Sequence, residues 1–341
     1  MTPSNGTDPL PPFPDSIPTI PIAKISHHLL LAQDKEEISK TLKACQTDGF
    51  FYLDLTTTES GRHLIEMSAE CLALAKRAFA LPQEEKTAFA NEKGTSIFGY
   101  KPMGSVKKTD LSAVPDSTEF FNIAKDHIHG ITEPRSYPRQ IIEGNPILAD
   151  FTTSAHACGM VVLQTLANAL GVDSDLFTSI CNFKHPSGDH VRLTRTVPVP
   201  ADDSRRRIGL SSHTDFGAVT ILFNWLGGLQ IQSRAKETEG DWLYVKPLAG
   251  HAIINLGDCM VKFTNGAVKS AKHRVVPSPG QQAAVDRYSI VYFVRPCDDV
   301  LMTPLRGFEA DEVVKVAGKF GDDRLYTAGE WNHARLTQMG A

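Results

Sequence analysis

Two side chains of the metal-ligating type, His213 and Asp215, stand two residues apart in the stretch SSHTDFGAVTILFN. Residues 212–224 alternate between apolar and small or polar types, which predicts a strand or a pair of strands. Residues i and i+2 of a strand point to the same face, so the two side chains are expected to lie side by side. An imidazole nitrogen and a carboxylate oxygen so placed can bind adjacent coordination positions of one metal ion, and they need a third ligand.

The segment VKSAKHRVVPSPG can supply that ligand, because it places His273 in a second predicted strand. Two histidines and one carboxylate form the facial arrangement that leaves three positions of an octahedral ferrous ion open. Three open positions suit oxygen chemistry, with two for a bidentate co-substrate and one for O2. Downstream, the predicted strand DRYSIVYFVRP holds Arg287 and Ser289 on one face, where a guanidinium and a hydroxyl can bind a distal carboxylate.

Each of these signals also has an ordinary explanation. A histidine and an aspartate two residues apart are common by chance, a single histidine such as His273 is more often an ordinary strand residue, and an Arg–Ser pair alone carries little information. The pieces occur together, in chain order and on separate β-like segments. Their joint occurrence favours one metal site.

In these residues the chain resembles the isopenicillin N synthase-like branch of the 2-oxoglutarate/Fe(II)-dependent dioxygenases. The motifs that carry the resemblance are HTD at 213–215, KSAKHRVV at 269–276 and RYS at 287–289. Flanking segments are also similar, namely GGLQI, DWLYVKPLAGHAIINLGD and YFVRP. The resemblance extends from about residue 191 to residue 296, with a weaker match upstream.

The resemblance implies that His213, Asp215 and His273 are the catalytic iron ligands and that Arg287 and Ser289 bind 2-oxoglutarate. Fe(II), 2-oxoglutarate and O2 are the implied cofactor and co-substrates, with ascorbate as an optional reductant. The implied reaction is hydroxylation, desaturation or ring rearrangement of a small natural product in secondary metabolism, with release of succinate and CO2. Two alternatives stay open: an isopenicillin N synthase-like Fe(II) oxidase that does not use 2-oxoglutarate, and a catalytically silent small-molecule binding protein.

The chain departs from the family pattern in two places. Many plant members carry an RLNYYP-like segment, whereas this chain has VRLTRTVPVP, with Thr194 and Thr196 at the positions of the Asn and the second Tyr. The family's GFFxVxNHG segment is present only as GFFYLDL. The first departure implies that the co-substrate site is assembled differently here.

The substrate pocket has less specific candidates. Arg192 and Arg195 are expected on the same face of a strand, where one of them could reach an anionic ligand, or else form surface ion pairs with the ADDSRRR loop. Aromatic residues are equally consistent with substrate contact and with core packing. The six candidates are Phe98, Tyr100, Phe121, Arg192, Arg195 and Phe223. Together they suggest an aromatic or acidic small molecule.

The composition is that of an ordinary globular protein, with 41% hydrophobic and 22% charged residues in 341. A net charge of −4 without a basic run argues against nucleic acid and anionic membranes as partners. The first residues lack a secretory signal pattern, and six cysteines without CxxC pairing are typical of free thiols in a reducing cytoplasm. The sequence indicates no particular oligomeric state.

Short β-like segments separated by turn residues follow one another from residue 192 to residue 296. This pattern predicts a mainly β fold, a double-stranded β-helix (jelly roll) backed by α-helices. The expected divisions are a flexible lead-in (1–17), an N-terminal mixed α/β region (18–180), the Fe(II)/2-oxoglutarate jelly-roll core (181–300) and a C-terminal helical segment (301–341). Helical spacing of Val313, Val314 and Ala317 supports the last, and Asn265-Gly266 predicts a tight hairpin turn.

Overall fold

The computed structural model describes residues 9–91, 96–105, 116–198, 209–310 and 325–339, and within them two β-sheets face each other. The eight-stranded sheet has the order β1 (Ala23–Ser26), β2 (Phe50–Asp54), β10 (His251–Leu256), β7 (Val219–Asn224), β12 (Arg287–Val294), β5 (His190–Thr196), β4 (Thr118–Ala124) and β3 (Gly99–Lys101). The four-stranded sheet has the order β6 (Leu210–His213), β11 (His273–Val275), β8 (Leu229–Gln232) and β9 (Trp242–Tyr244). The predicted jelly-roll core consists of these four strands facing β10, β7, β12 and β5.

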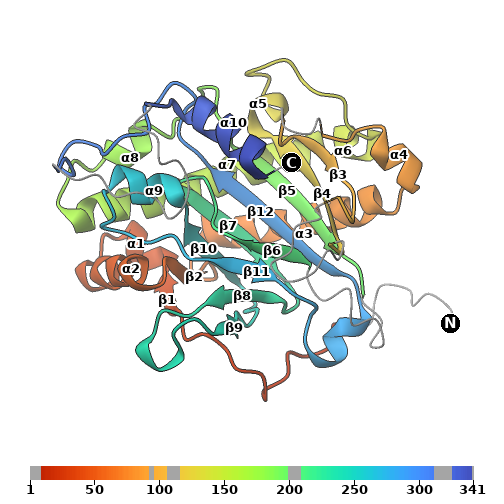
Figure 1. The fold of residues 1–341 in the computed structure, drawn as a ribbon, viewed down its shortest axis with the longest axis horizontal. Coiled ribbons are helices and arrows are strands. Elements are labelled where there is room, and N and C mark those ends of the chain that lie inside the picture. The colour runs from red at the N-terminus through yellow and green to blue at the C-terminus, as the bar shows by residue number, and fades with distance from the viewer. Residues whose placement is uncertain (1–8, 92–95, 106–115, 199–208, 311–324, 340–341) are drawn as a thin grey trace.

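Strands from the N-terminal region extend the large sheet at both edges. β1 and β2 continue it beyond β10, and β4 and β3 continue it beyond β5. The N-terminal region therefore shares one sheet with the jelly roll. Figure 1 shows the large sheet crossing the centre of the molecule, with the strands of the small sheet on its near side.

Helices cover the outer face of the large sheet. The described residues form the following helices, not all of which lie on this face: α1 (His27–Leu31), α2 (Lys35–Thr47), α3 (Glu59–Phe79), α4 (Gln83–Thr87), α5 (Lys125–Ile128), α6 (Arg139–Glu143), α7 (Asn145–Leu170), α8 (Leu176–Ser179), α9 (Asp258–Phe263) and α10 (Ala328–Met339), with 3₁₀ turns η1 (Lys236–Thr238) and η2 (Gly280–Ala284). Buried residues of α2, α3 and α7 form one hydrophobic core with the large sheet.

α7 is the central helix of this layer. It is long and apolar enough to cross a membrane by length and composition, but one side of it packs in the core against the large sheet. It ends at Gly171, whose φ of 73° is a left-handed conformation that glycine adopts without strain. Within the helix, a Cβ on Gly159 would lie 2.8 Å from Cγ2 of Val294, so this glycine lets α7 approach β12 closely.

The strands of the large sheet divide their side chains between two environments. On β12, Tyr292 and Val294 face the helices and belong to the hydrophobic core. Ser289 and Phe293 lie on the opposite face and line a cavity between the two sheets. The alternation follows from the two-residue repeat of a strand, and it separates residues that build the scaffold from residues that can contact a ligand.

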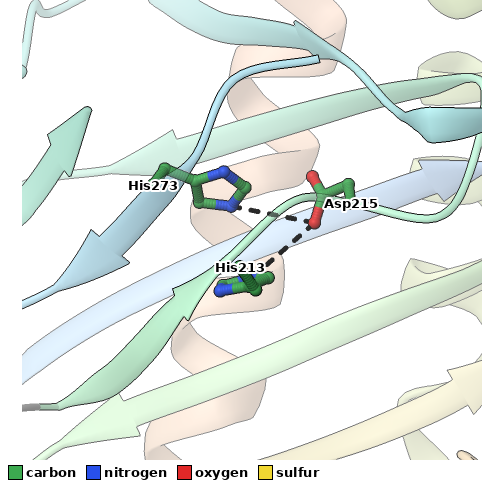
Figure 2. A group of neighbouring side chains, drawn as sticks. All are labelled: His213, Asp215 and His273. Atoms are coloured by element: carbon green, nitrogen blue, oxygen red, sulfur yellow. Dashed lines mark ion pairs between the residues drawn. The ribbon is translucent and has the colours of Figure 1, made fainter. Parts of the chain in front are cut away.

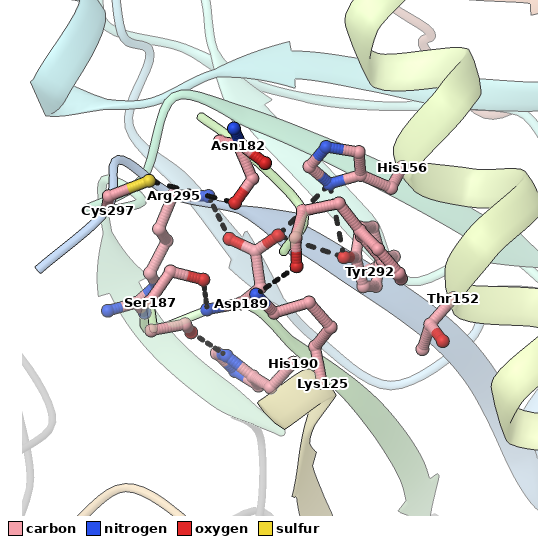
Figure 3. A network of polar contacts seen from close by, with 12 residues as sticks. Lys125, Thr152, His156, Asn182, Ser187, Asp189, His190, Tyr292, Arg295 and Cys297 are labelled. Atoms are coloured by element: carbon pink, nitrogen blue, oxygen red, sulfur yellow. Dashed lines mark hydrogen bonds and ion pairs between the residues drawn. The ribbon is translucent and has the colours of Figure 1, made fainter. Parts of the chain in front are cut away.

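A buried polar network holds α7 to the sheet on the helix side (Figure 3). The Asp189 carboxylate, just before β5, accepts a hydrogen bond from the Tyr292 hydroxyl at 2.9 Å and one from Nδ1 of His156 at 3.2 Å. It also accepts the backbone N–H of Arg295 at 2.6 Å. One carboxylate thereby connects the start of β5, the end of β12 and the middle of α7.

All six cysteines are buried and free, as the sequence predicts. Burial raises the pKa of Cys158 and of Cys259 to about 12. These thiols are therefore protonated at neutral pH.

The two ends of the chain are described in part. Within the predicted flexible lead-in, residues 1–8 lie outside the described residues, whereas the carbonyl of Pro11 accepts a hydrogen bond from Gln282 at 2.8 Å. Val313, Val314 and Ala317 also lie outside the described residues, and the helix present in the C-terminal segment is α10. Asn265-Gly266 does not join two strands: it follows α9, and the hairpin prediction at this point is wrong.

Because buried side chains of α7 pack in the core, shortening one of them should lower the free energy of unfolding substantially. Leu163 has no exposed surface, so Leu163→Ala is expected to lower the free energy of unfolding by about 2–5 kcal/mol. Urea unfolding followed by circular dichroism measures the change. Leu31→Ala, at a leucine that is 50% exposed, is the matched control and should cost much less; equal losses in both variants would contradict the placement of α7.

Candidate active site

The structure brings His213, Asp215 and His273 together at the inner face of the small sheet (Figure 2). β6 and β11 are antiparallel neighbours with His213 directly opposite His273, so both imidazoles point into the space between the sheets. Asp215 lies two residues beyond β6, in the connection that crosses to β7, rather than on a strand. Its Oδ1 is 3.8 Å from Nε2 of His213 and 3.7 Å from Nε2 of His273. The three ligand atoms lie within 4.8 Å of one another, close enough to bind one ion.

Backbone carbonyls orient the two imidazoles. Nδ1 of His213 donates to the carbonyl of Ser211 at 2.8 Å, and Nδ1 of His273 donates to the carbonyl of Ala271 at 3.2 Å. An N–H on Nδ1 leaves the lone pair on Nε2, the nitrogen that faces Asp215. Burial and the neighbouring His273 lower the pKa of His213 to about 3, which keeps this imidazole in the neutral form that binds metals.

Two neutral donors fix the Asp215 carboxylate. Its Oδ2 accepts hydrogen bonds from Oγ1 of Thr220 and from Nδ2 of Asn255, both at 2.7 Å. Burial alone would raise the pKa of Asp215, but the two histidines and these two hydrogen bonds outweigh it and hold the pKa below its usual range. The carboxylate is therefore ionised, with Oδ1 directed at the histidines.

Arg287 and Ser289 lie on the cavity side of β12, as their two-residue spacing predicts. Nε of Arg287 donates to the carbonyl of Gly227 at 2.8 Å, while its buried Nη1 has no hydrogen-bond partner among the described residues. Burial lowers the pKa of this guanidinium to about 10. A buried cation with an unsatisfied donor is suited to receive a carboxylate, so the residues present fit 2-oxoglutarate as well as ferrous iron.

The cavity between the sheets has a volume of about 60 Å³. It contains His213, Asp215, His273, Arg287 and Ser289, so residues from both sheets meet in one place. The other lining residues are Phe50, Thr118, Phe120, Arg192, Thr194, Leu210, Thr220, Leu222, Leu229, Asn255, Val275, Val291 and Phe293. Asp215 is the only acidic residue among them.

Of the six substrate candidates, some lie on the cavity face of the large sheet and others on its helix face. Arg192 lines the cavity, but Tyr100, Phe121 and Phe223 do not: they are almost fully buried in the core that the large sheet forms with the helices. Phe121 and Phe223 occupy positions of β4 and β7 whose side chains face the helices. Sequence alternation identifies the two faces of a strand without showing which one meets a ligand.

The remaining two candidates also lie away from the lining of this cavity. Arg195 forms ion pairs with Glu119 at 3.3 Å and with Asp286 at 2.8 Å. The expectation that Arg192 and Arg195 share a face is wrong, because residues three apart on a strand point to opposite faces. Phe98 precedes β3 and contacts the ring of His190 edge-on, with 5.9 Å between centroids.

Several lining residues are not among the six substrate candidates. Phe120 and Phe293 follow from the alternation once one cavity-facing residue of each strand is known, as Ser289 is for β12. Thr194 does line the cavity at the position of the family's Asn, whereas Oγ1 of Thr196 lies 2.9 Å from Oγ1 of Thr118. Thr220 and Asn255 act through Asp215, and no local sequence signal identifies them.

Comparison with known proteins identifies the family. The model for the 2OG-Fe(II) oxygenase superfamily matches residues 187–296, and the model for the N-terminal region of non-haem dioxygenases in morphine synthesis matches residues 17–143. The 2-oxoglutarate-dependent dioxygenase frbH of Dothideomycetidae sp. (strain 11243) is 30% identical over 292 residues, covering 85% of each chain. The chain belongs to the 2-oxoglutarate-dependent dioxygenases.

Other relatives of this dioxygenase agree. A 2-oxoglutarate-dependent dioxygenase of Aspergillus fumigatus is 28% identical over 342 residues, which cover 94% of this chain and 86% of the relative. The crystal structure of Neurospora crassa T7H with alpha-KG and thymine has the same fold, with a TM-score of 0.76 at 24% identity over 93% of this chain and 96% of the other. The predictions of a jelly-roll core, of an oxygenase and of Fe(II), 2-oxoglutarate and O2 are confirmed, and the matches support the main hypothesis over its two alternatives.

The hydrogen bonds to Asp215 predict a loss of iron affinity when one donor is removed. Thr220→Val keeps the shape of the side chain but leaves Oδ2 of Asp215 with one donor instead of two, so the carboxylate is oriented less firmly. Fe(II) affinity is expected to fall by about 10–100-fold. Anaerobic Fe(II) titration measures it, with Thr165→Val in α7, a buried threonine bonded to the carbonyl of Val161, as the matched control. Unchanged affinity in Thr220→Val would show that these hydrogen bonds do not support the metal.

Proposed function

We propose that His213, Asp215 and His273 hold the ferrous iron of this dioxygenase and that Arg287 and Ser289 hold the distal carboxylate of 2-oxoglutarate. The observation that carries this assignment is the buried Nη1 of Arg287, which has no hydrogen-bond partner in the part of the chain that the structure describes. Arg287 lines the same cavity as the three proposed ligand side chains. An unsatisfied buried donor costs stability, so a residue that keeps one is expected to meet a ligand.

Each protein group then has a defined task. The two histidines present neutral nitrogens, and Asp215 presents an ionised oxygen held in place by Thr220 and Asn255. When bound, the iron activates O2 for substrate oxidation coupled to conversion of 2-oxoglutarate into succinate and CO2. Apolar cavity walls, among them Leu222, Leu229, Val275 and Val291, limit access of water to the reacting groups.

The substrate is proposed to be a small natural product of secondary metabolism, oxidised in the cytoplasm by hydroxylation, desaturation or ring rearrangement. A narrow cavity lined by aromatic and aliphatic side chains supports a small, partly apolar molecule. T7H, which has the same fold, was crystallised with thymine, a small molecule. Six free buried cysteines support a reducing compartment.

The assignment predicts that Arg287 governs 2-oxoglutarate affinity. Adding 2-oxoglutarate to the Fe(II)-loaded protein without oxygen should produce the visible metal-to-ligand charge-transfer band of the chelate. Arg287→Ala should weaken 2-oxoglutarate binding by about 30-fold or more, because a charged hydrogen-bond partner contributes about 2–5 kcal/mol. Asp215→Ala should abolish iron binding and succinate formation.

Arg139→Ala is the matched control, because that side chain is 86% exposed on α6 and should leave the titration unchanged. An identical affinity for 2-oxoglutarate in wild type and Arg287→Ala would remove Arg287 from the site. Iron binding without any charge-transfer band would instead support the oxidase alternative.

A further inference from the structure

Arg192 is a second cation in the cavity, and it takes no part in the proposed binding of iron or 2-oxoglutarate. The side chain projects from β5 toward the space between the sheets. Its guanidinium carbon lies 4.2 Å from the ring centroid of Phe120 and 4.9 Å from that of Phe293. Nε donates to Oδ1 of Asn122 at 2.7 Å. Within the part of the chain that the structure describes, its two Nη atoms have neither a hydrogen-bond nor an ion-pair partner.

The head group of Arg192 is held firmly before any ligand arrives. Asn122 is itself held by two hydrogen bonds. Its side-chain Nδ2 donates to the carbonyl of Ile97 at 2.7 Å, and its backbone carbonyl accepts the Tyr137 hydroxyl at 3.0 Å. The ring of Phe293 stacks on His190 with 4.5 Å between centroids. With Nε engaged and two aromatic rings close to the guanidinium carbon, the two Nη atoms remain available to a ligand.

Among the described residues, the charges of the loaded site leave Arg192 without a counter-charge. The two positive charges of the iron and the charge of Arg287 are matched by Asp215 and the two carboxylates of 2-oxoglutarate. Lys101, whose ammonium lies 5.7 Å from the Phe120 ring centroid, is already paired with Asp116. Burial also lowers the pKa of Arg192 to about 10, as expected for a cation removed from water. A half-buried cation for which the described residues provide no ion-pair partner is suited to an anionic ligand.

The strand register separates Arg192 from the proposed co-substrate clamp. Arg192 pairs with Val291 of β12, whereas Arg287 pairs with Thr196 of β5. These two pairs are four residues apart along the strands, or about 13 Å. One carboxylate of 2-oxoglutarate cannot bridge that distance, so Arg192 is available to a different molecule.

We propose that Arg192 binds a carboxylate of the primary substrate, which is therefore an organic monoanion whose flat or apolar part lies against Phe120 and Phe293. This inference rests on the proposed function, because it assumes that iron and 2-oxoglutarate occupy the rest of the cavity. The planar guanidinium edge matches the two oxygens of a carboxylate, and the adjacent rings provide an apolar surface for the remainder of the molecule.

Matched pairs of acids and amides test the proposal without turnover. Benzoate is compared with benzamide, and phenylacetate with phenylacetamide, by anaerobic calorimetry on the protein loaded with Fe(II) and saturating 2-oxoglutarate. At least one acid is expected to bind wild-type protein about tenfold or more tightly than its amide, as a charged hydrogen-bonded pair requires. Arg192→Gln should remove the preference, and Arg192→Lys should retain part of it.

Arg195→Gln is the control, because Arg195 lies on the opposite face of the same strand in its ion pairs with Glu119 and Asp286. The proposal is overturned if wild-type protein shows no preference for either acid, including the case in which no probe binds, or if the preference survives in Arg192→Gln. The wild-type comparison decides the question even if a variant does not fold. A missing 2-oxoglutarate charge-transfer band reports failure of the proposed function separately, and the calorimetry can then be repeated on the metal-free protein.

Discussion

The hydrogen bonds that Thr220 and Asn255 donate to Asp215 connect the two sheets at the site. Asp215 follows a strand of the small sheet, whereas the donors belong to β7 and β10 of the large sheet. One carboxylate therefore links the two sheets through one oxygen and presents the other oxygen to two histidines. The donors are neutral, so the negative charge needed for a metal ligand is preserved while the carboxylate is held in place.

The geometry of the cavity depends on strand alternation around that connection. Side chains of β5 and β12 that face the helices pack in the core or join the Asp189 network, and their immediate neighbours face the opposite way, toward the ligands. Rigid packing on one face thus supports polar and cationic groups on the other. Arg192 is half-buried and Arg287 is buried, and neither guanidinium has an acidic partner among the described residues. The strands that carry them are packed against the helices on their other face.

Local patterns in the sequence were sufficient for much of this architecture. The spacing of ligand types identified His213, Asp215 and His273, and the two-residue spacing placed Arg287 and Ser289 on one face. In residues 146–170, apolar residues at helical spacing and the glycine that follows indicate a helix, and α7 spans Asn145–Leu170. The sequence carries no information about tertiary packing, so it left open whether Phe121 and Phe223 contact substrate or pack in the core, where the structure places them. Asn265-Gly266 has the backbone typical of a hairpin but ends a helical segment, because the preceding residues pack as α9.

The burial of all six thiols has a consequence for an enzyme that handles O2 at a redox-active metal. When oxidation misses the substrate, reactive oxygen species attack the protein itself, and the thiolate is the form of cysteine that they oxidise most readily. The cysteines here are enclosed in the fold and protonated at neutral pH. The native chain is therefore expected to resist self-inactivation through cysteine oxidation, and this protection should disappear as soon as the core opens.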